Sequence, residues 1–263
     1  GTTGTCSKTA VATVTVNALP NVTVTSPTIC SGKTAQPIAG GATTYSWTGG
    51  LAAVSNPTTP ILTTTTTYTV TGTTGTCSKT AVATVTVNAL PNVTVTSPTI
   101  CSGKTAQPIA GGATSYSWTG GLASISNPTT PVLTTTTTYT VTGTTGTCSK
   151  TAVATVTVNP LPNVTVSSPG ICTASSVTLQ ASGASAYSWT GGLAAISNPS
   201  TPVLTTTTTY TVTGTTGACS KTAVATVTVS SSLNVTVNSP SICSGSTASL
   251  LANGASSYSW TGG

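Results

Sequence analysis

Residues 68–87 read Tyr-Thr-Val-Thr-Gly-Thr-Thr-Gly-Thr-Cys-Ser-Lys-Thr-Ala-Val-Ala-Thr-Val-Thr-Val, two β-type runs on either side of a Thr-Gly turn signal. Tyr68 and Val70 share one face of the first run. In residues 81–87 apolar and polar side chains alternate towards the end, as they do in a half-solvated strand. Val and Thr are β-branched and stiff, which favours strands. The stretch predicts the last hairpin of a β-fold.

This stretch belongs to a repeat with a period of 71 residues. Residues 1–71 and 72–142 differ at only four pairs of positions, namely Thr44/Ser115, Ala53/Ser124, Val54/Ile125 and Ile61/Val132. The cysteines and tryptophans follow the same period. Because the sequence starts and stops within a repeat, we expect it to be part of a longer array.

Each period is divided by turn signals into about seven short β-type runs, a pattern typical of a small antiparallel sandwich. In the first full copy the runs are residues 22–25, 34–39, 43–48, 54–55, 61–66, 68–71 and 81–87. A Pro-containing linker precedes each copy. The predicted domains are residues 20–90, 91–161 and 162–232, with the end of a preceding module at 1–19 and the start of another at 233–263. The alternative is a β-solenoid, but solenoids usually have shorter periods.

The composition excludes most catalytic and metal-binding functions. The 263 residues include no Asp, Glu or His, so the ordinary general acids and bases are missing, and we expect no catalytic residue and no enzyme. Carboxylate calcium sites and histidine zinc sites are excluded in the same way, and no two cysteines form a CxxC pair. We therefore expect no metal and no cofactor.

The net charge of +6 does not indicate a nucleic-acid partner. The six lysines are scattered singly, at least 25 residues apart, whereas nucleic-acid binders group their basic residues. No apolar run approaches the roughly 18 residues that would span a bilayer, so we expect no membrane insertion.

Trp47 and Tyr45 share a strand face in the Tyr-Ser-Trp segment. They could form a sugar-stacking platform, but a small domain needs its few large side chains in the core. Tyr68 resembles the tyrosine corner, whose hydroxyl bonds nearby backbone. The predicted core residues are Trp47, Trp118, Trp189, Tyr68, Tyr139 and Tyr210.

Each repeat has an early cysteine, in Ile-Cys, and a late cysteine, in Cys-Ser-Lys. The early cysteines are Cys30, Cys101, Cys172 and Cys243, and the late cysteines are Cys6, Cys77, Cys148 and Cys219. Two cysteines per repeat are typical of an exported, disulfide-bonded protein. A bridge closing about 47 residues within a repeat would contribute about 4 kcal/mol.

The sequence leaves the disulfide pairing open. We expect pairs within a repeat, 30–77, 101–148 and 172–219. The alternative pairs join neighbouring repeats, 30–148 and 101–219, because the two cysteines of an ordinary sandwich would lie at opposite ends.

The threonine run at residues 63–67 recurs at 134–138 and 205–209. Such rows could bind ice or glycans, but a solvated edge strand is the commoner explanation.

Taken in order, the motifs Leu-Pro-Asn-Val-Thr-Val, Ile-Cys-Ser-Gly-Lys, Tyr-Ser-Trp, Thr-Tyr-Thr-Val-Thr-Gly-Thr and Gly-Thr-Cys-Ser-Lys-Thr resemble the tandem Ig-like/PKD-like modules of Bacteroidota surface proteins. The resemblance covers essentially the whole chain. It implies Ig-like sandwiches, export by the type IX route and a role in adhesin stalks. The sequence departs from this family where Thr76, or Ala218 in the last copy, replaces the usual acidic residue before the late cysteine.

Together these features predict an all-β tandem array of small Ig-like antiparallel sandwiches in an extracellular filament or cell-surface adhesin stalk. The alternative function is a glycan- or ice-binding repeat that uses the threonine rows or the Tyr-Trp strand. The expected partners are neighbouring modules of the same chain, with identical chains in a fibre and surface glycans as further candidates.

Overall fold

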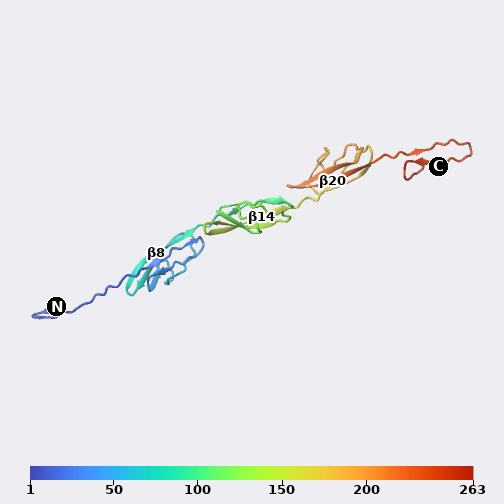
Figure 1. Cartoon of the computed structure of the whole chain (residues 1–263). Helices are drawn as coiled ribbons and strands as arrows, with labels where there is room; N and C mark the ends of the chain where they lie inside the picture. Colours follow the sequence, from blue (N-terminus) through green and yellow to red (C-terminus); the bar gives the residue numbers. More distant parts are fainter. Residues whose placement is uncertain (263) are drawn as a thin grey trace. The chain divides into compact units, whose positions relative to one another are not determined.

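The structure is a computed structural model that describes residues 1–262, and every regular element in that range is a β-strand. The strands recur in three copies, one period apart, as Figure 1 shows through the long strand labelled in each. We call residues 20–90 repeat 1, 91–161 repeat 2 and 162–232 repeat 3, keeping boundaries that remain predictions. The predicted all-β fold class is confirmed. No helix in residues 1–262 is long and apolar enough to cross a membrane.

Repeat 1 forms two sheets. Its strands are β3 (Thr23–Val24), β4 (Thr28–Cys30), β5 (Ala39–Gly40), β6 (Thr44–Trp47), β7 (Thr66–Thr74) and β8 (Cys77–Asn88). Strands β3 and β5 pair with each other, and the second sheet has the order β4-β8-β7-β6. All neighbours are antiparallel except β4, which runs parallel to the end of β8. Strand β4 is absent from the predicted runs because a parallel partner far away in sequence leaves no hairpin signal nearby.

Repeats 2 and 3 have the same strands in the same order. Those of repeat 2 are β9 (Thr94–Val95), β10 (Thr99–Cys101), β11 (Ala110–Gly111), β12 (Ser115–Trp118), β13 (Thr137–Thr145) and β14 (Cys148–Asn159). Those of repeat 3 are β15 (Thr165–Val166), β16 (Gly170–Cys172), β17 (Ala181–Ser182), β18 (Ala186–Trp189), β19 (Thr208–Thr216) and β20 (Cys219–Ser230). Outside the repeats lie β1 (Thr2–Thr3), β2 (Cys6–Ser7), β21 (Thr236–Val237) and β22 (Ala252–Asn253).

Three of the predicted runs, 34–39, 54–55 and 61–66, do not become strands over their full length, and β5 takes up only the last residue of the first. The segment 54–66 pairs with residues 33–39 only at intervals, through hydrogen bonds from Ala39 N to Ser55 O, from Thr59 N to Ala35 O and from Leu62 N to Lys33 O. Pro57 and Pro60 lie in this segment and have no N–H to donate, so a regular ladder cannot form.

The long hairpin of each repeat provides the core face. In β7 the side chains of Tyr68 and Val70 are 5 % and 0 % exposed, and Val85 of β8 is 0 % exposed. Val22 and Ala39, from the small sheet and its approach, pack against Val70. The two sheets therefore enclose one apolar layer, as in a sandwich.

The chain divides into two compact units. One consists of residues 1–98, 107–130 and 138–156, and the other of residues 99–106, 131–137 and the chain from 157 onwards. Repeat 1 lies entirely in the first unit and repeat 3 entirely in the second, whereas repeat 2 contributes to both.

Candidate functional site: the inter-repeat disulfides

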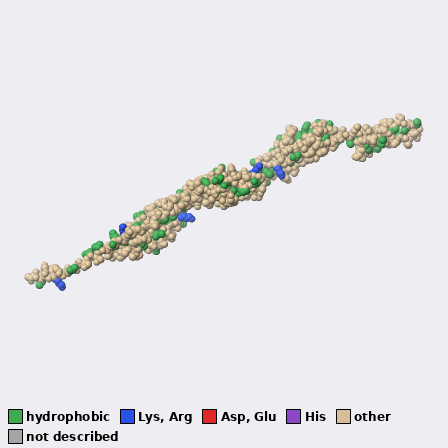
Figure 2. Space-filling view, viewed as in Figure 1, with side chains coloured by type: hydrophobic (Ala, Val, Ile, Leu, Met, Phe, Trp, Pro, Cys, Tyr) green, Lys and Arg blue, Asp and Glu red, His purple; other side chains and the backbone are tan. Residues whose placement is uncertain are grey.

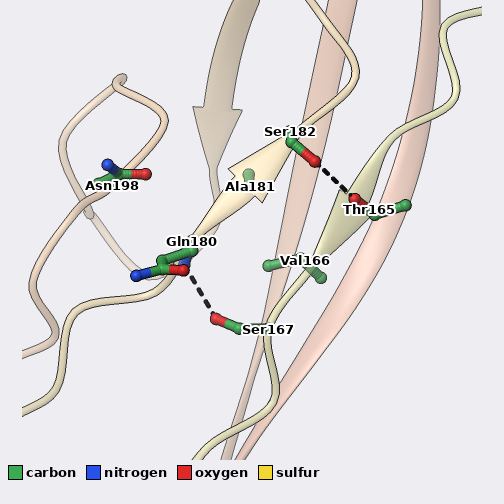
Figure 3. Close-up of a pocket in the computed structure, with 7 residues that line it drawn as sticks. All are labelled: Thr165, Val166, Ser167, Gln180, Ala181, Ser182 and Asn198. Atoms are coloured by element: carbon green, nitrogen blue, oxygen red, sulfur yellow. Dashed lines mark hydrogen bonds between the residues drawn. The ribbon is translucent and has the colours of Figure 1, made fainter.

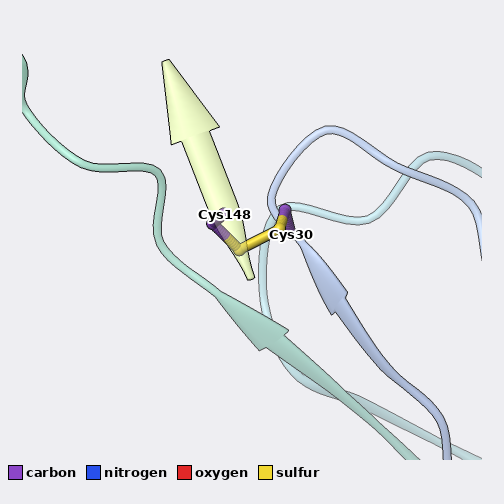
Figure 4. Close-up of a disulfide and its surroundings, with 2 residues drawn as sticks. All are labelled: Cys30 and Cys148. Carbon is purple, nitrogen blue, oxygen red and sulfur yellow. A yellow bond between two sulfur atoms is a disulfide. The ribbon is translucent and has the colours of Figure 1, made fainter. Parts of the chain in front are cut away.

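Two disulfides join neighbouring repeats. In the first unit Cys30 of repeat 1 is bonded to Cys148 of repeat 2 (Figure 4), and in the second unit Cys101 of repeat 2 is bonded to Cys219 of repeat 3. The Cα atoms are 5.5 Å apart in both bridges, and the sequence separation is 118 in both. Each bridge therefore joins the early cysteine of one repeat to the late cysteine of the next.

The strand arrangement explains this pairing. Cys30 ends β4 and lies in register with Asn88, the last residue of β8. Cys77 begins β8, eleven residues earlier, which places it about 36 Å away along a strand. A disulfide needs Cα atoms within roughly 7 Å. The two cysteines of one repeat thus lie at opposite ends of its longest strand.

The expected pairing within repeats is therefore wrong. The pairs 30–77, 101–148 and 172–219 do not form, and the alternative pairs 30–148 and 101–219 are the ones present. Within the described residues Cys77 and Cys172 are unbonded, as are Cys6 and Cys243. Strand β4, which carries Cys30 to the far end of the repeat, is missing from the runs predicted from the sequence. Pro27 before it was a usable signal, since proline is tolerated at the start of an edge strand.

Each bridge lies beside a backbone hydrogen bond that closes the end of the repeat. Ser31, directly after the early cysteine, donates its N–H to Asn88 O at 2.8 Å, and Ser102 donates to Asn159 O at 2.8 Å. The bonded late cysteines Cys148 and Cys219 are each only 1 % exposed. The late-cysteine side of each bridge is therefore shielded from solvent, whereas the early cysteines Cys30 and Cys101 are half-buried.

The tryptophans predicted for the core pack against it. Trp118 is 9 % exposed, while Trp47 and Trp189 are half-buried beside the clusters around Tyr68 and Tyr210. Each indole N–H donates to a backbone carbonyl seven residues along the chain, at 2.9 Å in all three repeats. The rings are held by the fold, which leaves the Tyr-Trp strand poorly suited to stack on a sugar.

The tyrosine hydroxyl that bonds nearby backbone is not that of Tyr68. The Tyr45 hydroxyl accepts from Ala42 N at 3.1 Å and donates to Ala42 O at 2.9 Å. Tyr116 and Tyr187 repeat this arrangement. Tyr68, Tyr139 and Tyr210 are buried in the core at 5 %, 5 % and 4 % exposure.

The threonine run at 63–67 does not form a flat row on a strand. Strand β7 begins only at Thr66, and the preceding threonines lie in a loop. The Thr65 hydroxyl accepts from Val87 N at 3.1 Å, and the Thr66 hydroxyl donates to Thr64 O at 2.9 Å. Part of the run is therefore engaged with the protein's own backbone.

A polar surface hollow lies on repeat 3 (Figure 3). It is lined by Thr165, Val166, Ser167, Gln180, Ala181, Ser182 and Asn198. The Thr165 and Ser182 hydroxyls are hydrogen-bonded to each other at 2.7 Å, and the Ser167 hydroxyl accepts from Gln180 N at 2.9 Å. These hydroxyls therefore hydrogen-bond within or beside the small β15–β17 sheet.

The sequence has six lysines and no acidic residue, and several of the lysine side chains are visible in Figure 2. Within residues 1–262 no group of three or more metal-binding side chains comes together. In the part of the chain that the structure describes, the fold brings four cysteines together as two disulfides.

No protein-family model and no curated protein matches this chain. Solved structures similar to it include the I-band fragment I67–I69 from titin, at 14 % identity and a TM-score of 0.40, covering 82 % of this chain and all of that one. Extracellular domains 3–5 of Drosophila OTK match at 10 % identity and a TM-score of 0.34, over 81 % of this chain and all of that one. Immunoglobulin domains 1–5 of Sidekick-1 match at 16 % identity and a TM-score of 0.30, over 81 % of this chain and 59 % of that one.

Proposed function

We propose that this chain is a non-enzymatic structural region of an extracellular filament or adhesin stalk, in which disulfides reinforce the junctions between Ig-like repeats. The observation that carries the proposal is the overlap of the two bridges. Cys101 lies inside the loop that Cys30–Cys148 closes, and Cys148 lies inside the loop that Cys101–Cys219 closes.

The overlap changes the route of a pulling force through the chain. The shortest covalent path runs from the start of the chain to Cys30, across to Cys148, back along repeat 2 to Cys101, across to Cys219 and on to the end. It contains about 120 of the 262 peptide links. At about 3.5 Å per residue, the maximum extension falls from about 900 Å to about 420 Å.

The bridges also take the linkers between repeats off that path. The linkers between repeats, near Pro91 and Pro162, lie within the bypassed segments. A linker of a few residues would otherwise be the only covalent connection at each junction. With the bridge, two separate covalent connections resist bending and pulling there, which suits a stalk whose repeats each contact their neighbours.

Extension of single molecules held by their two ends tests the proposal. We expect the oxidised chain to stop extending near 420 Å and the reduced chain to reach about 900 Å. Cys30→Ser should lengthen the oxidised limit, because the path then follows the backbone from the start of the chain to Cys101. Cys77→Ser is the matched control and should leave the limit unchanged. An oxidised chain that reaches the reduced length would refute load sharing by the bridges.

The disulfides support an oxidising location outside the cytosol. The resemblance of the sequence motifs supports the cell surface of a Bacteroidota-type organism as that location. Valines on the outer face of the long strand recur at one-period intervals, and Val82, Val153 and Val224 are each 59 % exposed. These exposed apolar side chains, 71 residues apart along the sequence, support lateral contacts between identical chains in a fibre.

A further inference from the structure

Both disulfides obey one rule, and the unbonded cysteines are those for which the rule requires a further repeat. Cys77 is a late cysteine, so its partner would be an early cysteine 118 residues before it. Cys172 is an early cysteine, so its partner would be a late cysteine 118 residues after it. Neither position lies among residues 1–263.

The Cys77 thiol contacts a backbone carbonyl whose equivalent is used at the bridged junctions. The thiol donates to Asn17 O, with Sγ 3.7 Å from the oxygen. Asn17 lies one period before Asn88, whose carbonyl instead accepts from Ser31, the residue directly after an early cysteine. The Cys77 thiol thus faces an acceptor that, in the bridged junctions, serves the strand carrying the early cysteine.

The backbone around Cys172 matches the backbone around Cys30, the early cysteine of a bridge. Strand β16 runs parallel to the end of β20, with Cys172 in register with Ser230, as Cys30 is with Asn88. Thr173 donates its N–H to Ser230 O at 2.9 Å, as Ser31 does to Asn88 O. Cys172 is exposed, whereas bonded Cys30 is half-buried. The backbone at Cys172 therefore has the bridged geometry without the bridge.

We infer that Cys77 and Cys172 are attachment sites for further repeats of this kind, Cys77 bonding an early cysteine and Cys172 a late one. The inference deepens the proposed stalk function and rests on it. Each bond forms by thiol–disulfide exchange with a small disulfide donor. One cysteine thiolate attacks the donor and releases one thiol, and the second cysteine thiolate then displaces the other. Two protein thiols are oxidised as one donor disulfide is reduced to two thiols.

The test counts free thiols in the polypeptide isolated from its source without reductant, by alkylation under denaturing conditions and intact mass. Cys172→Ser removes one partner of a bridge, so we expect the count to rise by one. Cys77→Ser should raise it by one as well. Cys30→Ser is the matched control and should also add one thiol, because it frees Cys148.

A fall of one thiol on either substitution would overturn the inference, since that cysteine would then have been free. An unchanged count accompanied by loss of a small adduct would overturn it too. In non-reducing electrophoresis a single-chain mass identifies the attached repeat as part of the same polypeptide, and multiples of that mass identify a second copy. The thiol count does not depend on load, so this inference and the stalk function can fail separately.

Discussion

At the scale of single residues, close packing against the long hairpin leaves room only for glycine at one position in each repeat. Gly214 lies within β19, and a Cβ atom built there would be 2.5 Å from Val164 Cγ2 and 2.8 Å from Ala184 Cβ. A Cβ on Gly72 or Gly143 would clash in the same way with the equivalent valine and alanine of repeat 1 or 2. The segments next to the small sheet therefore lie so close to the long strand at this position that a side chain there would clash with them.

Gly214→Ala should destabilise repeat 3 by about 1–3 kcal/mol, because overpacking displaces core side chains. Hydrogen exchange of the peptide containing Ala218 measures this, since that residue distinguishes the hairpin of repeat 3 from its copies. We expect exchange that requires unfolding to become about tenfold to hundredfold faster.

The control for this substitution is Gly170→Thr. Repeats 1 and 2 carry Thr28 and Thr99 at that position, and a Cβ on Gly170 meets no atom closer than 4.0 Å. Exchange in repeat 3 should hardly change with this variant. Equal effects from the two substitutions would show that the close approach at Gly214 is not what constrains the residue.

At the scale of elements, the two-residue turn of the long hairpin positions the late cysteine. Strands β19 and β20 pair from Thr208 to Thr216, and Thr216 lies opposite Cys219. The turn consists of Gly217 and Ala218, and Gly217 has φ 59°. A glycine with positive φ at the first turn position matches the type II′ turns that suit the twist of a hairpin.

Gly217→Val should destabilise the hairpin by about 1–2 kcal/mol through backbone strain alone, because nothing lies within 4 Å of an added Cβ. Gly217→Asn should cost less, since asparagine tolerates this conformation better. Urea unfolding of the two variants, followed by exchange of the Ala218 peptide, compares them. Equal losses of stability for valine and asparagine would contradict the strain argument.

At the scale of the whole molecule, the absence of acidic groups and histidine affects how stability depends on pH. Stability changes with pH only where the folded and unfolded states bind different numbers of protons. Asp, Glu and His are the side chains that ordinarily titrate between pH 2 and 7, and the chain has none.

We therefore expect the midpoint of thermal unfolding to be nearly the same at pH 3 and at pH 7. The net charge also stays near +6 over this range, so self-repulsion changes little. Differential scanning calorimetry at constant ionic strength measures both midpoints. A loss of more than about 5 °C at pH 3, roughly 1 kcal/mol for a small domain, would contradict this expectation.

The sequence by itself determined the all-β class, the 71-residue period and the absence of ordinary acid–base chemistry, because β-propensity, repetition and composition are local or additive properties. It also indicated the long hairpin at residues 68–87, whose two strands are neighbours in the chain.

Only the tertiary structure decided the disulfide pairing and the role of β4. Strand β4 pairs with residues 58 positions away, as Thr28 does with Thr86, and no local pattern encodes a parallel partner at that distance. That pairing carries Cys30 to the end of the repeat opposite Cys77. Which cysteines meet depends on the positions of strand ends in space, and the period of 71 is equally compatible with both pairings.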